Sequence, residues 1–319
     1  MKVIESLQNK IALPFPIVTI GNFDGVHLGH QAVLKLVKQR AQEMDGTVVV
    51  LTFDPHPLRV LAPDLELRFL SDPEEKLKLL AQAGVDVVVR LPFTREFAAQ
   101  TPLEFMRDVL GKGLGTRELY VGQNFRFGQG RQGTIQTLLD AAPSLGCTVR
   151  VIAPVMVNGL PVSSTRIRDL IQAGAVSQAA AELGRSYVLR GRVVRGEGRG
   201  EALGYPTANL LPPPGRVLPQ DGVYAAELEI DSKILPAVTY IGERPTFGPG
   251  ARRIEAHLLE GAQNLYERQI AVTFHEWLRE DMVFDSTALL TRQIAADVGR
   301  TREVLRSLVH GATPRVSSV

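Results

Sequence analysis

The sequence is poor in cysteine, in long apolar runs and in net charge, and each shortage excludes a class of protein. Cys147 is the only cysteine in 319 residues, so an intrachain disulfide and a cysteine-rich metal site are excluded. No apolar run reaches 18 residues, so we expect no membrane-spanning helix. Lysine and arginine number 36 against 34 aspartates and glutamates, a balance that does not predict a nucleic-acid partner.

The rest of the composition is typical of a folded protein of two domains. Hydrophobic residues make up 45% and charged residues 22%, which excludes a mostly disordered chain. At about 100–200 residues per domain, the length predicts two domains. The first residues lack the apolar core of a signal peptide, so we expect a cytoplasmic location.

The first half alternates strand-like and helix-like patterns. Runs rich in β-branched residues occupy 17–20, 47–53, 85–91, 119–121 and 148–152, and helical patterns occupy 27–44, 71–80, 101–110 and 134–142. Such runs are typical of strands buried on both faces. We expect a capping box at residues 71–74, beginning at Ser71. The alternation predicts an α/β domain with an open parallel sheet that binds ligands at the carboxyl ends of its strands.

The pattern changes near residue 184, where strands become dominant. They are expected at 187–194, 223–230, 234–241, 254–259 and 269–278, with Gly- and Pro-rich connections and a closing amphipathic helix over 286–309. This predicts a small antiparallel β-barrel with a C-terminal helix. The sequence therefore predicts domains at 1–184 and 185–319.

The densest motif is GNFDGVHLGH at residues 21–30, where a strand leads through a glycine-rich turn into a helix. Glycines let the backbone approach a ligand, and a helix N-terminus attracts phosphate. His27 and His30 share a helical face and can donate hydrogen bonds to nucleotide phosphates. Surface or metal-binding histidines are the alternative, although no other ligand-type residue stands at metal spacing.

This string resembles the H-x-G-H signature of the nucleotidyltransferase superfamily. Its longer form resembles the bacterial bifunctional riboflavin kinase/FAD synthetase family, as do LTFDPHP at 51–57, VGQNFRFG at 121–128 and SSTRIR at 163–168. The resemblance implies a Rossmann-like FMN adenylyltransferase domain in which His27 and His30 are catalytic. It further implies nucleotide and phosphate contacts from Gly21, Phe23, Asp24, Gly29, Ser163, Ser164, Arg166 and Arg168, and flavin contacts from Phe53, Pro57 and Asn124.

Two of these assignments have plainer alternatives. Ser163 and Ser164 can cap a helix whether or not they bind phosphate. Many relatives carry Asp where Asn124 stands, so we do not assign Asn124 as a sole metal ligand.

Two other phosphate-binding motifs are excluded. GQGRQG at 128–133 has the glycine spacing of a dinucleotide-binding turn, but it does not directly follow a strand and no acidic residue stands about 20 positions on. No P-loop sequence occurs. Nicotinamide binding and P-loop kinase chemistry are therefore not expected.

The second half carries GRVVRGEGRGEALGYPTANL at residues 191–210, which resembles the riboflavin kinase signature. The resemblance implies that Thr207 and Asn209 contact Mg²⁺ and that Glu255 is the general base. It further implies that Gly198 and Gly204 contact phosphate and that Arg279 contacts the flavin. Glu201 stands where the family usually has a basic residue. A solvated barrel position is the alternative for Glu255.

The two resemblances together imply an enzyme that phosphorylates riboflavin with ATP to FMN and then adenylylates FMN to FAD. The alternative is a monofunctional nucleotidyltransferase with a flavin-binding, non-catalytic barrel. A flavin sensor without enzyme activity and an RNA-binding protein built on the arginine-rich loop are weaker candidates. We expect small-molecule partners, neither nucleic acid nor membrane, and leave a homo-oligomer open.

Overall fold

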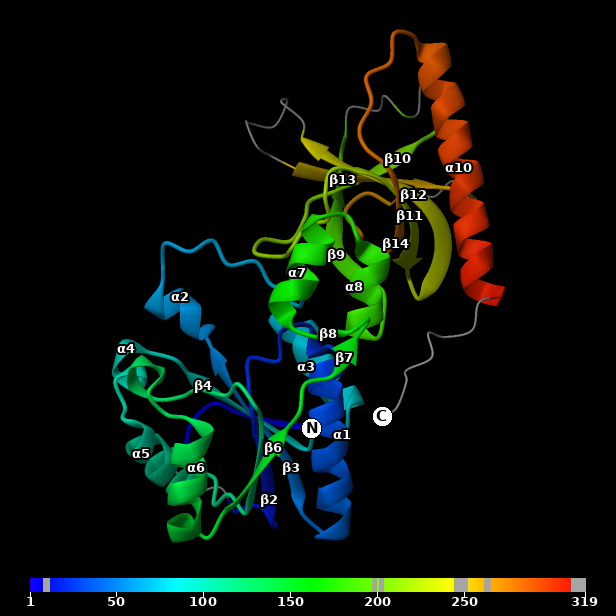
Figure 1. The fold of residues 1–319 in the computed structure, drawn as a ribbon. Helices are drawn as coiled ribbons and strands as arrows, with labels where there is room; N and C mark the ends of the chain where they lie inside the picture. Colours follow the sequence, from blue (N-terminus) through cyan, green and yellow to red (C-terminus); the bar gives the residue numbers. More distant parts are fainter. Residues whose placement is uncertain (8–11, 197–199, 201–203, 244–251, 261–264, 311–319) are drawn as a thin grey trace. The chain divides into compact units, whose positions relative to one another are not determined.

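The computed structural model describes residues 1–319 except 8–11, 197–199, 201–203, 244–251, 261–264 and 311–319. The chain divides into two compact units, Met1–Ser164 and Thr165–Val319, which are described separately below (Figure 1).

A six-stranded parallel sheet forms the centre of the first unit, as predicted. Its order is β1-β4-β3-β2-β5-β6. The strands are β1 (Lys2–Ile4), β2 (Pro16–Ile20), β3 (Thr47–Asp54), β4 (Val87–Pro92), β5 (Glu118–Gly122) and β6 (Thr148–Ile152). The chain runs from β2 outward through β3 to β4 and returns to β5 on the other side of β2. Ligands bind at such a reversal of strand order in open α/β sheets.

Helices cover both faces of this sheet (Figure 1). On one face, α1 (Leu28–Glu43) and α3 (Pro73–Gln82) bury Leu34, Val37 and Leu80 against Ile17 and Val48. On the other face lie η2 (Phe105–Gly113), which is a π-helix, and α6 (Ile135–Ala141). The apolar cores on the two faces explain why the strands are so rich in valine.

Shorter elements complete the first unit. They are η1 (Asp24–Val26), α2 (Pro57–Leu61), α4 (Arg95–Ala98), α5 (Pro102–Glu104), η3 (Gln129–Arg131), η4 (Ala142–Leu145), β7 (Met156–Val157) and β8 (Leu160–Pro161).

Four details of the first unit differ from the predictions. Strand β1 was not predicted. Strand β6 lies at the sheet edge and is largely exposed, so it is not buried on both faces. The helix predicted over 101–110 is divided between α5 and the π-helix η2. The N-cap of α3 is Asp72, whose carboxylate accepts from Glu75 N at 2.7 Å, and not Ser71, because Pro73 fits the first helical position.

The second unit is a closed antiparallel barrel that follows two helices, α7 (Ser164–Gln172) and α8 (Val176–Leu183). The barrel order is β10-β13-β12-β11-β14-β9. Its strands are β9 (Tyr187–Val194), β10 (Thr207–Leu210), β11 (Gly222–Ile230), β12 (Lys233–Glu243), β13 (Arg252–Leu258) and β14 (Gln269–Arg279). Helix α10 (Thr287–His310) packs against β11, β12 and β14. The barrel and this helix confirm the predicted fold, although β10 was not predicted.

The buried carboxylate of Glu118, at the start of β5, joins the sheet to α1 through a hydrogen bond with Arg40. Glu118 is 4% exposed and accepts hydrogen bonds from Arg40 at 2.8 Å and from Arg150 at 3.2 Å. Burial disfavours the charged carboxylate, but the arginine hydrogen bonds outweigh it and hold the pKa of Glu118 below its ordinary value. Stability from this group is therefore present above the ordinary pKa and is lost as the pH falls through the lowered one.

We expect Glu118→Gln to destabilise the first unit by about 2 kcal/mol at pH 7, because it leaves two arginines beside a neutral group. The difference from the parent protein should narrow as the pH falls below 4.5, the ordinary pKa of the carboxyl. Hydrogen exchange of the amides of β2 and β5 measures this, whereas the single tryptophan, Trp277, reports on the barrel. The control is Asp108→Asn in an exposed ion pair. Equal effects of the two substitutions would contradict the assignment.

Candidate active sites

The turn between β2 and α1 has an unusual backbone. Phe23, Gly25 and Val26 all have positive φ angles, of 49°, 76° and 38°. This left-handed path brings the chain from the carboxyl end of β2 to the N-terminus of α1 within a few residues. Backbone N–H groups and the positive end of the 16-residue helix α1 are thus placed where parallel strands bind ligands.

His27 and His30 come together at this helix N-terminus. Their rings stack with centroids 3.7 Å apart, and the ring of Phe23 lies 4.8 Å from that of His30. Gly29 permits this stack, since a Cβ there would lie 3.1 Å from Cε1 of His27. Gly21 likewise makes room for Phe23, whose Cε2 would lie 3.2 Å from an added Cβ.

Burial, the neighbouring His27 and the ammonium of Lys76 together lower the pKa of His30 well below 6.5. The imidazole is therefore neutral at pH 7. Its Nδ1 atom is buried and has no hydrogen-bond partner among the described residues. A neutral imidazole donates one N–H, so His30 can act as a hydrogen-bond donor to a phosphate oxygen.

Asp24, predicted as a nucleotide contact, holds the turn in place. Its carboxylate is buried and accepts from Leu70 N at 2.9 Å and from Ser71 N at 3.2 Å. Gly25 N in turn donates to Ser71 Oγ at 3.0 Å. Asp24 thus attaches the segment before α3 to the turn, and a direct contact with nucleotide stays a prediction.

The predicted flavin-side residues lie at the carboxyl ends of β3 and β5. Phe53 is half-buried in a cluster with Phe93 and Phe97, with ring centroids 5.5 Å from each. Pro57 begins α2, and Asn124 is exposed in the loop after β5. Their proximity to one sheet edge agrees with a shared ligand, but their contacts with flavin stay predictions.

Residues 163–168 span the division between the two units. Ser163 is exposed, whereas the Ser164 hydroxyl donates to the carbonyl of Asp24 at 3.1 Å and so supports the turn. In the second unit, Arg166 forms an ion pair with the buried Glu182 of α8. Arg168 is half-buried on the same helix as Arg166. Phosphate binding by these serines and arginines stays a prediction.

Four polar residues meet on one face of two paired barrel strands. Thr207 lies opposite His257, and Asn209 opposite Glu255, across the antiparallel pair β10–β13. Directly opposed residues share a face of a sheet, and here it is the face opposite to the core residues Ile254 and Ala256. The barrel therefore places a hydroxyl, an amide and a carboxylate within one small region.

The side chain of His257 orients the chain just before β10. Its Nδ1 lies 2.9 Å from the carbonyl of Pro206, and its ring packs edge-on against Tyr205 with centroids 5.2 Å apart. His257 thus orients the segment that leads into β10.

The glycine-rich segment approaches these strands closely. A Cβ on Gly196 would overlap the amide group of Asn209, and one on Gly200 would overlap the carbonyl of Tyr205. Gly204 has a φ of 82°. The predicted contact Gly198 and the unusual Glu201 lie outside the described residues.

Arg279, predicted as a flavin contact, joins the barrel to α10. Its Nη2 lies 2.8 Å from Oδ2 of Asp297, which is 5% exposed, and its Nη1 donates to the carbonyl of Glu280 at 2.9 Å. The guanidinium thus has a structural role in the barrel unit, and its flavin contact stays a prediction.

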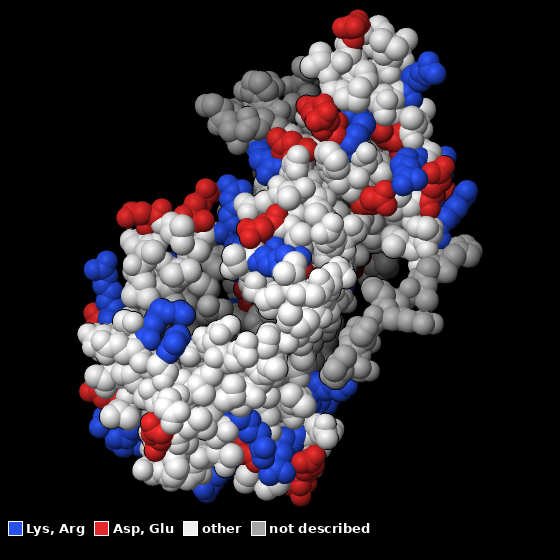
Figure 2. All heavy atoms as spheres, viewed as in Figure 1, with Lys and Arg blue, Asp and Glu red and all other residues white. Residues whose placement is uncertain are grey.

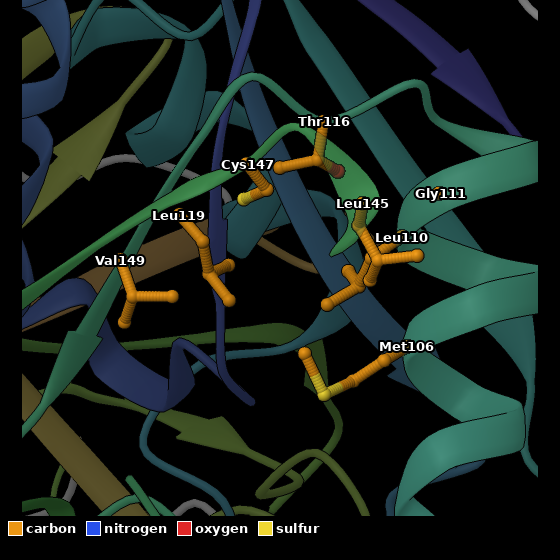
Figure 3. A pocket seen from close by; sticks show the side chains of 8 residues that line it. All are labelled: Met106, Leu110, Gly111, Thr116, Leu119, Leu145, Cys147 and Val149. Carbon is orange, nitrogen blue, oxygen red and sulfur yellow. The ribbon is translucent and has the colours of Figure 1, made fainter. Parts of the chain in front are cut away.

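A small apolar cavity in the first unit lies beneath η2 and is lined by none of these residues (Figure 3). Its volume of about 10 Å³ holds about one water molecule. Cys147 lines it, and burial raises the pKa of this thiol to about 11. The cavity is too small for a nucleotide or a flavin.

Three findings concern other classes of ligand and partner. Within the described ranges, no group of three His, Cys, Asp or Glu side chains is arranged to hold a metal ion. None of the described helices combines the length and the apolar character needed to cross a membrane. Acidic and basic side chains are interspersed over the face shown in Figure 2.

Comparison with known proteins identifies the family. Residues 13–166 match the family model "FAD synthetase", and residues 183–305 match "Riboflavin kinase". A bifunctional riboflavin kinase/FMN adenylyltransferase of Escherichia coli strain K12 is 38% identical over 95% of this chain and 97% of its own. Its counterpart in Bacillus subtilis is 34% identical over 88% and 90%. The chain belongs to this family.

A solved structure has the same fold over nearly the whole chain. It is described as a macrolide-efflux protein from Streptococcus pneumoniae and covers 94% of this chain and 98% of its own, with a TM-score of 0.86 and 31% identity. Together with the two family models, it agrees with the predicted order of the domains. The boundary at 184 stays a prediction, since the units divide after Ser164 and the kinase model begins at residue 183.

Sequence reasoning missed two features of the first site. One is the set of hydrogen bonds that the Asp24 carboxylate accepts from Leu70 N and Ser71 N. A carboxylate in a ligand-binding motif is interpreted as a ligand contact before a structural role is considered. The other is Lys76, whose ammonium lies 3.4 Å from the carbonyl of Asn22 in the same turn. In the sequence it is one of two lysines on an amphipathic helix.

We expect Gly196→Ala to lower riboflavin phosphorylation by at least about tenfold, because the new methyl group overlaps Asn209 and small displacements of site residues are costly. FAD synthesis from supplied FMN should be unchanged. Gly299→Ala is the control, because nothing lies near a Cβ at this position of α10. Normal phosphorylation by the Gly196 variant would contradict the close approach.

Proposed function

We propose that the barrel unit phosphorylates riboflavin and that the sheet unit converts the resulting FMN to FAD. In the first reaction, the ribityl hydroxyl bonds to the γ-phosphorus of ATP, the bond to the β-phosphate breaks, and ADP leaves. In the second, an oxygen of the FMN phosphate bonds to the α-phosphorus of another ATP, and pyrophosphate leaves. The observation that carries this proposal is that residues 13–166 match the FAD synthetase model and residues 183–305 match the riboflavin kinase model, with His30 and Glu255 in different units.

In the barrel, Glu255 accepts the proton of the attacking hydroxyl. A carboxylate suits this role when it lies within hydrogen-bond reach of the proton. The register places Asn209 directly across from it, where the amide can hold the phosphate side of the same complex. The close approach of Gly196 lets backbone N–H groups reach the phosphates.

The barrel residues fit a magnesium ion. Thr207 and Asn209 present oxygen donors on one strand face, and Mg²⁺ prefers oxygen ligands while retaining several waters and substrate phosphates. When bound, Mg²⁺ would neutralise charge on the phosphates. Thr207 and Asn209 are the residues that would hold it.

In the sheet unit, the protein positions and neutralises the reactants, and forms no covalent bond with them. The neutral His30 and its stacked neighbour His27 donate hydrogen bonds to phosphate oxygens on which charge develops. Ser164 supports the turn through Asp24, and Arg166 and Arg168 bind the triphosphate. Phe53, Pro57 and Asn124 contact the flavin.

The monofunctional alternative is less well supported. It requires a barrel without catalysis, whereas this barrel matches the riboflavin kinase model and retains Thr207, Asn209 and Glu255. The cytoplasmic location, the absence of a nucleic-acid or membrane partner, and the oligomeric state stay predictions.

Glu255→Gln tests the barrel assignment. We expect FMN formation from riboflavin to fall by at least about 100-fold, because the amide cannot accept the proton. FAD synthesis from supplied FMN should stay within about twofold of the parent. Glu229→Gln, an exposed barrel position, is the control. Chromatography of the flavins measures both steps, and loss of both activities in the folded variant would contradict separate sites.

His30→Ala tests the sheet assignment. The variant should convert riboflavin to FMN at the normal rate and accumulate it, with FAD formation reduced by about 100-fold through loss of a transition-state hydrogen bond. Normal output of FAD would remove His30 from its assigned role.

A further inference from the structure

Lys76 lies outside the recognised motifs and contacts the turn between β2 and α1. Lys76 lies on α3, and its Nζ atom is 3.4 Å from the carbonyl oxygen of Asn22, just after β2. The side chain is half-buried, in contrast to the exposed Lys78 on the same helix. A hydrogen bond of this length is weak, so it does not account for burying an ammonium group.

Among the residues that the structure describes, the Lys76 ammonium has no counter-ion in direct contact. In the described part of the chain, no carboxylate lies within ion-pair distance of its Nζ. Asp24 and Asp54 act on it only at longer range, and Arg90 opposes them. The Asp24 carboxylate accepts N–H groups of Leu70 and Ser71. Burying a cation without a paired anion is costly, and a bound anion would remove that cost.

The position of Lys76 is fixed relative to the histidines. The hydrogen bonds to the Asp24 carboxylate hold residues 70 and 71 against the turn, and α3 begins two residues later, at Pro73. The ammonium lies near enough to His30 to lower the pKa of that imidazole. Lys76, His27 and His30 therefore place one positive charge and two imidazoles around a single turn.

We propose that Lys76 binds a phosphate oxygen in the FMN adenylyltransferase reaction and neutralises charge as the bond to the α-phosphorus forms. This inference rests on the proposed function of the sheet unit. The phosphate belongs either to FMN or to ATP, since both bring anionic oxygens to this edge of the sheet. A lysine is suited to the role because its compact charge and three donors can follow the phosphate as it reacts.

The test is the steady-state kinetics of FAD synthesis by the full-length Lys76→Met variant, which keeps the length of the side chain and removes its charge. We expect kcat/KM to fall by about 100-fold, as for loss of one charge-stabilising donor, while riboflavin phosphorylation by the same preparation is unchanged. Lys78→Met is the control and should match the parent. Lys76→Arg keeps the charge, so its kcat/KM should be at least about tenfold higher than that of Lys76→Met.

The kinetic constants distinguish the two sources of phosphate. A rise confined to the KM for ATP assigns the contact to ATP, and one confined to the KM for FMN assigns it to FMN. A fall in kcat alone assigns it to the transition state. Kinetics within twofold of the parent, or an arginine variant no better than the methionine variant, would overturn the proposal.

A second measurement needs no variant. Reductive methylation of the parent protein, followed by peptide mass spectrometry, should show Lys76 protected by ATP or by FMN and Lys78 unaffected. Equal methylation of Lys76 with and without the substrates would overturn the proposal, even if the methionine variant folds poorly.

If the parent protein makes no FAD from FMN, the function proposed for the sheet unit fails. If the parent does so and Lys76→Met matches it, only the role of Lys76 fails.

Discussion

The arrangement of the site in the first unit depends on the hydrogen bonds that the Asp24 carboxylate accepts from the backbone N–H groups of residues 70 and 71. Phe23, Gly25 and Val26 of this turn have positive φ angles, which are unfavourable for the two residues that are not glycine. A buried carboxylate that accepts several N–H groups can offset that cost. The turn then holds the histidine pair, the N-terminus of α1 and the start of α3 in fixed positions at one sheet edge.

We propose that the two units bind phosphate in different ways. In the proposed mechanism, the sheet unit uses a turn at a helix N-terminus, where N–H groups and the imidazoles of His27 and His30 provide hydrogen bonds. The barrel uses two paired strands, which align Thr207, Asn209 and Glu255 by register, and a glycine segment that approaches them closely. Because His30 lies in one unit and Glu255 in the other, a substitution at either residue should leave the reaction of the other unit intact.

Most of the fold could be predicted from the sequence, because valine-rich runs and alternating patterns determine which segments are strands. Strand β10 could not, since its four residues, TANL, lack a β-type hydrophobic pattern and their strand structure depends on pairing with β9 and β13. Ser71 and Asp72 are both good N-caps, and only the structure shows that Ser71 contacts Gly25 instead. The site motifs identified the chemistry, whereas the separate environments of Lys76 and Lys78 depend on tertiary packing.

The proposed function requires a phosphoryl transfer and then an adenylyl transfer on the same flavin. The most direct measurement is the stoichiometry of products when the purified chain is given riboflavin, ATP and Mg²⁺. We expect one pyrophosphate for each FAD and one ADP for each molecule of FMN or FAD formed, with FMN appearing before FAD. Riboflavin left unchanged by folded protein, or less ADP than the sum of FMN and FAD, would contradict the proposed function.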